Sequence, residues 1–284
     1  MSRLAVDAGG TWFRYEIAGE EEVCGRVPAK STKLGSFISS LLEKHPHIDA
    51  VAISFAGQVD EGVILSAPNI EIDEPEIENF IENRFGIPLK IENDLNCAAL
   101  AESVYWNEKE LAAIYSGTGL GCGIVSRGEI VHGWRGMAGE IGHIPYKKTP
   151  LRCGCGKDNC IELFASGSGM KKWMEFSGCG GEPDLRMLAD SDRAECRKIA
   201  ADYLEAMLTA TATVVTLFNP KRVVLGGGVL AHNPDIVPKI EERIDRYALP
   251  ASCEGLAVVQ SRIENASMQG AKLLLDTMTT VSRD

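Results

Sequence analysis

The sequence predicts an α/β protein made of two lobes that share one plan. Apolar, strand-like segments alternate with helical ones, and the opening pattern of hairpin strands returns after residue 111. A short glycine turn lies at corresponding places in both halves, DAGGT at residues 7–11 and SGTGLG at residues 116–121. We therefore expect an N-terminal lobe over residues 1–111 and a C-terminal lobe over residues 112–284, with a cleft between them and the last helix packing back on the N-terminal lobe.

The elements of each lobe are predicted from hydrophobic periodicity. In the first lobe we expect strands at residues 3–7, 12–18, 22–28, 50–54 and 88–92, and helices at 34–44, 76–84 and 94–105. In the second lobe we expect strands at residues 111–116, 120–126, 129–132 and 221–225, and helices at 166–176, 194–218 and from 265 onward.

Composition and charge exclude several classes of protein. The chain has 284 residues, 45% of them hydrophobic and 24% charged, which is ordinary for a globular protein and excludes a disordered or collagen-like chain. A net charge of −11 without a basic tract argues against nucleic-acid and membrane-surface partners. The longest apolar stretch, residues 206–218, is too short to span a bilayer, and no signal-like segment opens the chain. We expect a cytoplasmic protein.

The two glycine turns are candidate phosphate-binding loops. Glycine lets backbone N–H groups approach phosphate oxygens, and Thr11 and Thr118 can add hydroxyl donors. Neither turn is a P-loop, since no G-x-x-x-x-G-K-[ST] occurs in the sequence. The alternative is a pair of tight hairpins that bind nothing.

A third glycine run, at residues 226–228, follows an apolar strand and is interpreted as a backbone platform for the adenosine part of a nucleotide. Gly226, Gly228 and Ala231 also fit a relaxed dinucleotide fingerprint. That fingerprint normally opens a βαβ unit, and here fewer than sixty residues follow it. A dehydrogenase is therefore the weaker interpretation.

A cluster of cysteines predicts a metal site. Cys153, Cys155 and Cys160 lie on one short segment, and His143 precedes them by ten residues. Three thiolates and an imidazole complete a tetrahedral zinc shell with no open position, which indicates a structural metal. The alternatives are three reduced surface thiols, or a nucleic-acid-binding zinc ribbon, which would need a second cysteine pair and basic flanking residues.

Carboxylates and amides supply the predicted chemistry. Asp94 stands at a strand-to-helix junction, where it could accept a proton from a substrate hydroxyl during phosphoryl transfer, or simply cap the helix. Glu140 and Glu162 flank the predicted zinc segment and, with Asn69, could bind the vicinal hydroxyls of a sugar. Each acid taken singly is as readily explained as a solvated surface group.

These motifs together resemble the ROK family of sugar kinases and related repressors. The segments that carry the resemblance are DAGGT (7–11), APN (67–69), ENDLNCAAL (92–100), SGTGLGCGIV (116–125), AGEIGH (138–143), CGCGKDNCIE (153–162) and LGGG (225–228). Their order covers most of the chain. The sequence departs from the family pattern at Trp12, where Lys or Asn is usual, and in the acidic segment after Asn69.

The resemblance implies an actin/hexokinase-like, ribonuclease H-like fold in which two lobes close over ATP and a hexose. Asp94 would be the general base. The substrate would be bound by Gly57, Asn69, Asn93, Asp94, Glu140, His143 and Glu162. The nucleotide and its Mg²⁺ would be bound by Asp7, Gly9, Gly10, Thr11, Gly117, Thr118, Gly119, Gly226, Gly227 and Gly228. Structural Zn²⁺ would be bound by His143, Cys153, Cys155 and Cys160.

The resemblance further implies an ATP-dependent hexokinase that phosphorylates the 6-hydroxyl, with glucose as the expected sugar. N-acetylglucosamine and N-acetylmannosamine kinases are the alternatives within this class. Because members of the family often dimerise, the resemblance also implies a homodimer. A sugar-sensing transcriptional regulator is an alternative of another class, but such regulators carry a helix-turn-helix domain ahead of the first phosphate motif, where this sequence offers no room. A catalytically silent sugar sensor is a further alternative.

Overall fold

The computed structural model describes residues 2–19 and 22–278 of the chain. These residues form two compact units. Among the described residues, unit 1 contains residues 2–19, 22–101, 132–138 and 263–278, and unit 2 contains Glu102–Val131 and Gly139–Arg262.

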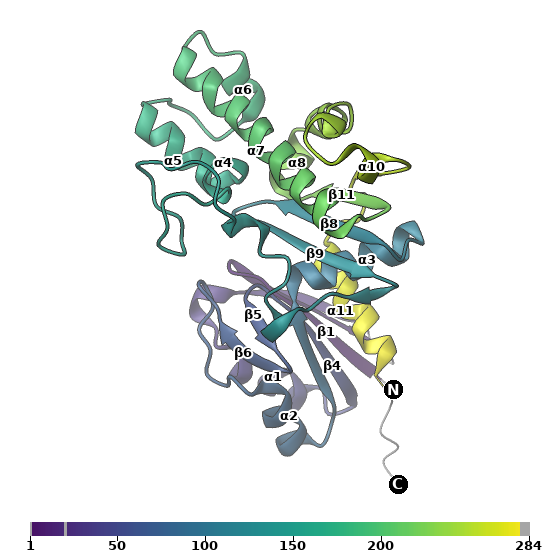
Figure 1. The fold of residues 1–284 in the computed structure, drawn as a ribbon. Coiled ribbons are helices and arrows are strands. Elements are labelled where there is room, and N and C mark those ends of the chain that lie inside the picture. The colour runs from purple at the N-terminus through teal and green to yellow at the C-terminus, as the bar shows by residue number, and fades with distance from the viewer. Residues whose placement is uncertain (1, 20–21, 279–284) are drawn as a thin grey trace. The chain divides into compact units, whose positions relative to one another are not determined.

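Unit 1 is built on a five-stranded mixed sheet in the order β3-β2-β1-β4-β7 (Figure 1). The strands are β1 (Ser2–Ala8), β2 (Trp12–Ala18), β3 (Val23–Pro28), β4 (Ile48–Phe55) and β7 (Leu89–Asn93). The first three run antiparallel to one another, whereas β1, β4 and β7 run parallel. A two-stranded hairpin, β5 (Gln58–Asp60) and β6 (Val63–Ser66), follows β4.

Successive side chains of β1 alternate between two cores, as the pleat of a strand requires. Leu4 and Val6 are fully buried in a core shared with α1 (Leu34–Lys44) and α2 (Ile77–Phe85). Ala5 faces the opposite side, where small residues of β1 and β4 meet α3 (Asp94–Trp106) and α11 (Ala266–Thr277). Figure 1 shows α11 lying along β1 and β4. Alanines on that face leave room for the helices to approach the sheet closely.

Unit 2 repeats the strand plan of unit 1. Its sheet has the order β10-β9-β8-β11-β12, with β8 (Leu111–Ser116), β9 (Leu120–Ser126), β10 (Glu129–Ile130), β11 (Arg222–Gly226) and β12 (Ala257–Gln260). Again the first three pair antiparallel and β8, β11 and β12 pair parallel. The expected return of the hairpin pattern after residue 111 is confirmed.

The long helix α7 (Ala194–Phe218) organises the core of unit 2. Its Tyr203 is fully buried, and the phenol hydroxyl donates to Ser116 Oγ at 2.8 Å. The other helices of the unit are α4 (Glu162–Ala165), α5 (Gly167–Ser177), α6 (Leu185–Ala189), α8 (Gly228–His232), α9 (Ile236–Glu241) and α10 (Pro250–Cys253). Short 3₁₀ turns are formed by Ala29–Ser31 and Trp134–Gly136 in unit 1, and by Ile141–His143 and Ile244–Arg246 in unit 2.

Several features were not predicted from the sequence, among them the short helices α4, α6, α8, α9 and α10. Strand β12 has only four residues, too few for a periodic signal, and the hairpin β5–β6 is equally short. A disulfide joins Cys179 to Cys196. The third strand of the second lobe is also shorter than expected, because β10 ends at Ile130 rather than at residue 132. No helix in the described part of the chain is both long and apolar enough to cross a membrane.

Candidate functional site

In unit 1 the candidate residues gather at one edge of the sheet. Strands β1, β4 and β7 are parallel, so the segments that follow their carboxyl ends leave the sheet on the same side. These segments are the glycine turn at residues 9–11, the backbone at residues 56–57 and the start of α3 at Asp94. Ala56 N donates to Ala8 O at 3.0 Å, which joins the first two of these segments. Ligands of open α/β sheets characteristically bind at this edge.

Asp7 lies near the end of β1, directly opposite Arg14 on β2. Its side chain is only 7% exposed, and its carboxylate accepts hydrogen bonds from Arg14 Nη1 at 3.1 Å and Ser267 Oγ at 3.2 Å. Burial raises the pKa of Asp7, and this effect outweighs the opposing influence of Arg14 and Ser267. Asp7 is thus a buried acid held in a fixed orientation beside the first glycine turn.

Asn93, and not Asp94, caps helix α3. Its Oδ1 accepts hydrogen bonds from the backbone N–H groups of Leu95 at 2.9 Å and Asn96 at 3.2 Å, while its Nδ2 donates to Gly57 O at 2.9 Å. These contacts use both ends of the amide and fix its orientation. The capping role that the sequence allowed for Asp94 is therefore wrong, because α3 begins at Asp94 and the residue before it supplies the cap.

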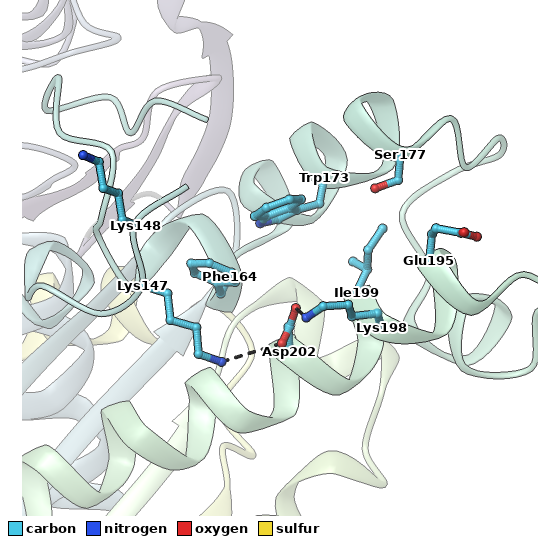
Figure 2. A pocket seen from close by; sticks show the side chains of 9 residues that line it. All are labelled: Lys147, Lys148, Phe164, Trp173, Ser177, Glu195, Lys198, Ile199 and Asp202. Atoms are coloured by element: carbon cyan, nitrogen blue, oxygen red, sulfur yellow. Dashed lines mark hydrogen bonds and ion pairs between the residues drawn. The ribbon is translucent and has the colours of Figure 1, made fainter. Parts of the chain in front are cut away.

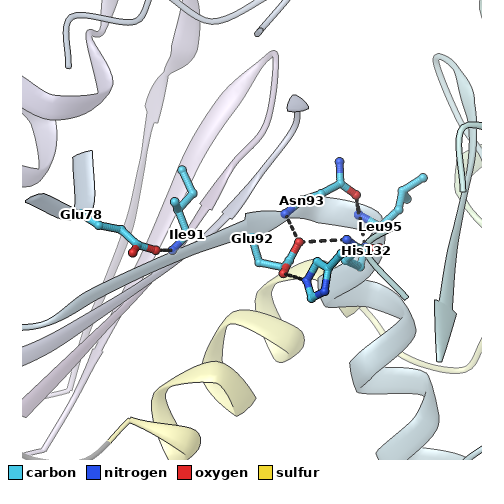
Figure 3. Close-up of polar contacts among 7 residues, drawn as sticks. Glu78, Ile91, Glu92, Asn93, Leu95 and His132 are labelled. Atoms are coloured by element: carbon cyan, nitrogen blue, oxygen red, sulfur yellow. Dashed lines mark hydrogen bonds and ion pairs between the residues drawn. The ribbon is translucent and has the colours of Figure 1, made fainter. Parts of the chain in front are cut away.

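Further polar contacts, centred on Glu92, surround this junction, and the sequence did not reveal them. Glu92 Oε2 lies 2.7 Å from His132 Nε2, and Glu92 Oε1 accepts from the backbone N–H of Asn93 at 2.8 Å and from Asn96 Nδ2 at 2.9 Å. Figure 3 shows Glu92 between Asn93 and His132. Burial opposes ionisation of Glu92, yet the hydrogen bonds from His132 and Asn96 outweigh it and lower the pKa. The same contact raises the pKa of His132.

Two glycines near this edge of the sheet, Gly10 and Gly57, are closely packed against neighbouring residues. A Cβ on Gly10 would lie 3.0 Å from Asn69 Cβ, so the first glycine turn and the expected sugar-binding turn are in close contact. A Cβ on Gly57 would collide with Ser66 O and lie 2.5 Å from Phe55 Cε1. Only glycine therefore fits at residue 57.

The acidic segment that follows Asn69 has structural functions. Asp73 accepts hydrogen bonds from the backbone N–H groups of Gly35 at 2.8 Å and Ser36 at 2.9 Å, and from Ser36 Oγ at 2.6 Å. It thereby caps the first turn of α1. Glu78 accepts from Ile91 N at 3.0 Å, which ties α2 to β7 (Figure 3). The departure from the family pattern at this segment is thus accounted for by local stabilisation.

In unit 2 the second and third glycine turns also share one sheet edge. Residues 117–119 follow β8, and residues 226–228 begin at the last residue of the adjacent parallel strand β11. Gly227 has φ +90°, and a Cβ there would collide with the backbone of Ser116. Gly167 N donates to Gly117 O at 2.8 Å and Ser168 N donates to Thr118 O at 3.2 Å, so the start of α5 packs on the second turn. The three segments form one backbone surface.

Glu162, the first residue of α4, links this surface to the cysteine cluster. Its Oε2 accepts from the backbone N–H of Leu120 at 3.1 Å, and its Oε1 lies 3.3 Å from Cys153 Sγ. A Cβ on Gly119 would be 2.7 Å from Glu162 Oε2. The cluster and the second glycine turn therefore hold Glu162 from two sides.

The four expected metal ligands come together in unit 2. One ligand atom from each of His143, Cys153, Cys155 and Cys160 lies within 4.8 Å of the others. Cys153 Sγ is 3.6 Å from His143 Nδ1, and Cys155 Sγ is 3.4 Å from Cys160 Sγ. A tetrahedral zinc shell places its ligand atoms about 3.5–3.8 Å apart, given the usual Zn–S and Zn–N lengths. The residues therefore fit a zinc ion.

His143 presents its two ring nitrogens to different partners. Nδ1 faces Cys153, and Nε2 lies 3.9 Å from Glu140 Oε2. A metal-bound imidazole is commonly oriented by a carboxylate on its second nitrogen. Nδ1 is therefore the nitrogen that would bind the ion, and Glu140 lies on the Nε2 side of the ring.

Comparison with known proteins decides the family. Residues 3–278 match the sequence model of the ROK family. The chain belongs to the ROK family. It is 30% identical to a glucokinase of Halalkalibacterium halodurans over 89% of this chain and 88% of that protein. It is 28% identical to the DNA-binding transcriptional dual regulator NagC of Escherichia coli over 85% of this chain and 64% of that protein.

The fold agrees with that assignment. The crystal structure of a ROK hexokinase from Thermus thermophilus superimposes with a TM-score of 0.79 and 25% identity, covering 98% of this chain and all of that one. The α/β architecture and the Cys/His cluster expected from the sequence are confirmed. The candidate residues divide between the units of this ROK protein. Unit 1 holds Asp7, Gly9, Gly10, Thr11, Gly57, Asn69, Asn93 and Asp94, and unit 2 holds Gly117, Thr118, Gly119, Glu140, His143, Cys153, Cys155, Cys160, Glu162, Gly226, Gly227 and Gly228.

Proposed function

We propose that this ROK protein is an ATP-dependent hexose kinase that transfers the γ-phosphoryl group to the 6-hydroxyl of glucose. The observation that carries the proposal is the position of Asp94. It opens α3 directly after the Asn93 cap, at the sheet edge that also holds the glycine turn at residues 9–11. A carboxylate at this position can accept the proton of a sugar hydroxyl as the phosphoryl group arrives.

The residues of unit 1 would bind sugar and phosphate. Asn69 and the remaining Nδ2 hydrogen of Asn93 would meet sugar hydroxyls. Gly57, whose Cβ position is occupied by Ser66 O and Phe55, would line the same place with its backbone. The turn at residues 9–11 would donate backbone N–H groups and the Thr11 hydroxyl to phosphate. Asp7 would orient the Mg²⁺ that accompanies ATP, whose role when bound is to neutralise phosphate charge.

Unit 2 carries the remaining candidate residues. Residues 117–119 and 226–228 provide a backbone surface for the nucleotide, and Glu140, His143 and Glu162 would bind sugar hydroxyls. Zinc bound by His143 and the three cysteines would stabilise the segment that positions these groups, as structural zinc does. Positioning and charge neutralisation are what phosphoryl transfer chiefly requires.

Glucose is proposed as the sugar because the chain is 30% identical to a glucokinase across nearly its whole length. The alternatives within the same class are N-acetylglucosamine and N-acetylmannosamine. A sugar-binding regulator is a second candidate because the chain is also 28% identical to NagC, of which it covers 64%. We further propose that the kinase is a cytoplasmic homodimer without nucleic-acid partners. Light scattering of the purified protein would test the oligomeric state.

The test is sugar-dependent turnover of ATP to ADP. Glucose, mannose, fructose, N-acetylglucosamine, N-acetylmannosamine and a blank without sugar are compared for the native chain and for Asp94→Asn. Asp192→Asn, at an exposed loop position, is the matched control. We expect turnover with glucose that falls at least about 100-fold in Asp94→Asn and is unchanged in the control.

Other outcomes would revise the proposal in specific ways. Faster turnover with an N-acetylated hexosamine would keep the kinase and replace its substrate. Sugar binding measured by calorimetry, combined with no turnover of any hexose, would reject the kinase in favour of the regulator.

A further inference from the structure

A cavity of about 300 Å³ lies within unit 2, away from the glycine turns. It is bounded by α4, by α5, by the first turns of α7 and by the loop segment at residues 147–148 (Figure 2). None of its lining residues belongs to the proposed sugar, nucleotide or zinc sites. Its volume is at the lower end of the range for small-molecule sites.

One side of the cavity is aromatic and apolar. The rings of Phe164 and Trp173 have centroids 5.5 Å apart, and Ile199, which is 7% exposed, lies close to them along α7. Trp173 Nε1 is buried and has no hydrogen-bond acceptor among the described residues.

The other side of the cavity is ionic. Lys147 Nζ lies 3.7 Å and Lys198 Nζ 2.5 Å from the carboxylate of Asp202, so two ammonium groups share one carboxylate. Figure 2 shows both lysines converging on Asp202. Lys148 adds a third positive charge to the lining. Glu195, the other acid there, has Arg193 3.9 Å away. Three lysines and two acids thus line the cavity, with Glu205 acting on Lys147 from nearby, in a chain whose net charge is −11.

We propose that this cavity binds a small organic anion with one flat apolar face. The flat face would stack on Trp173 and Phe164, and the carboxylate or phosphate would meet Lys147 and Lys198. Two kinds of ligand share this chemistry: a hexose phosphate, whose ring has an apolar C–H face, and an aromatic carboxylate. Charge-assisted hydrogen bonds and aromatic stacking are the interactions that would select them.

Two segments that line the cavity also carry residues of the proposed sugar site. Phe164 is on the same short helix as Glu162, and Lys147 follows His143 by four residues on one loop. A ligand that orders these segments would alter the sugar KM, a consequence that rests on the proposed function. Binding itself does not depend on that function.

The test is an NMR titration of the tryptophan indole N–H signals, without ATP or free hexose. The chain has four tryptophans, so four signals are expected, and Trp173→Phe identifies the relevant one. Glucose 6-phosphate, indole-3-acetate and inorganic phosphate are titrated separately to roughly 10 mM, which detects even millimolar affinity. Lys147→Gln and Lys198→Gln remove cations from the cavity, and Lys171→Gln on α5 is the matched control because Lys171 is exposed and does not line it.

We expect a saturable shift of the Trp173 signal with one of the organic anions, weakened about tenfold in Lys198→Gln and in Lys147→Gln and unchanged in Lys171→Gln. Which organic anion binds distinguishes the sugar phosphate from the aromatic acid. The proposal is overturned if neither moves this signal, or if inorganic phosphate moves it equally. A glucose 6-phosphate shift confined to Trp12, next to the first glycine turn, would also count against it, because it would place binding at the catalytic site. A chain that fails as a kinase can still pass this test.

Discussion

His132 and Glu92, forty residues apart in the chain, form an ion pair whose Nε2 and Oε2 atoms are 2.7 Å apart. The contact ties the segment after β10 to the end of β7, one residue before the Asn93 cap. Through Asn93 and Asn96, the pair supports the first turn of α3, on which the proposed base Asp94 lies. The geometry makes the two residues positioning groups for Asp94.

The first prediction concerns the pH dependence of this pair. The pKa of His132 is raised above 6.5, so the imidazolium's contribution to stability is complete below that pH and disappears as pH rises through the folded value. The pKa of Glu92 is lowered below 4.5, so its contribution is complete above that pH and disappears as pH falls through the folded value. The pair should therefore contribute most between about pH 5 and pH 6.

A double-mutant cycle with Glu92→Gln and His132→Gln measures this contribution. We expect a coupling free energy of up to about 1 kcal/mol near pH 6, kept small because the His132 side chain is 52% exposed. It should fall markedly by about pH 9, where His132 is neutral and only an uncharged hydrogen bond to Glu92 can remain. Urea unfolding at a series of pH values provides the data. Coupling that is constant over the whole range would contradict the assignment of an ion pair.

The elements of this fold could be predicted because their signals are local. The expected strands at residues 12–18, 111–116 and 120–126 and the expected helices at 34–44 and 194–218 match the observed bounds. Their apolar periodicity is a local signal, and several of them end at a glycine or an asparagine, such as Gly19, Gly117 and Asn219. The cysteine cluster was equally predictable, because three of its four ligands lie within eight residues.

The remaining features depend on contacts between distant parts of the chain. His132 has no sequence feature that points to Glu92, and the pair exists only because the segment after β10 meets the end of β7. The Asp73 cap on α1 spans about forty residues in the same way. The disulfide could not be inferred from Cys179 and Cys196 alone, because nine cysteines allow many pairings.

The second prediction concerns the Asp73 cap. Burial opposes ionisation of Asp73, but the hydrogen bonds from Ser36 and from the backbone N–H of Gly35 outweigh it and lower the pKa below 3.8. Both carboxylate oxygens of Asp73 accept hydrogen bonds, and Asn replaces one of them with an NH2 group and removes the charge. Asp73→Asn should therefore destabilise the fold by about 1 kcal/mol at pH 7. The difference should vanish as pH falls through the folded pKa, because the native acid is then protonated. Thermal unfolding checks this, with Glu82→Gln at an exposed position of α2 as a control that should be neutral. Equal losses in the two variants would refute the cap.

The third prediction concerns the close approach of α11 to α3. A Cβ on Gly270 would collide with the backbone of Cys97, whereas a Cβ on Gly180 would meet nothing within 4 Å. Alanine is favoured over glycine inside a helix by about 1 kcal/mol, so intrinsic propensity alone predicts that Gly270→Ala stabilises the fold. Because backbone atoms cannot move aside cheaply, we expect instead a loss of about 2 kcal/mol. Gly180→Ala should change stability by less than about 0.5 kcal/mol. A stabilised Gly270→Ala variant in urea unfolding would show that the helices can separate without cost.

The fourth prediction concerns the proposed zinc ion. Cys155 and Cys24 are both exposed, but only Cys155 belongs to the cluster with His143. Elemental analysis should find about one zinc per native chain and per Cys24→Ser chain, and much less in Cys155→Ser. Loss of the ion would loosen the segment that holds Glu140 and Glu162, so the sugar KM should rise at least about tenfold while the ATP KM changes less than about twofold. The comparison of the two KM values is informative, because general unfolding would raise the KM for the sugar and the KM for ATP together. Less than about half an equivalent of zinc in gently purified native protein would reject the site.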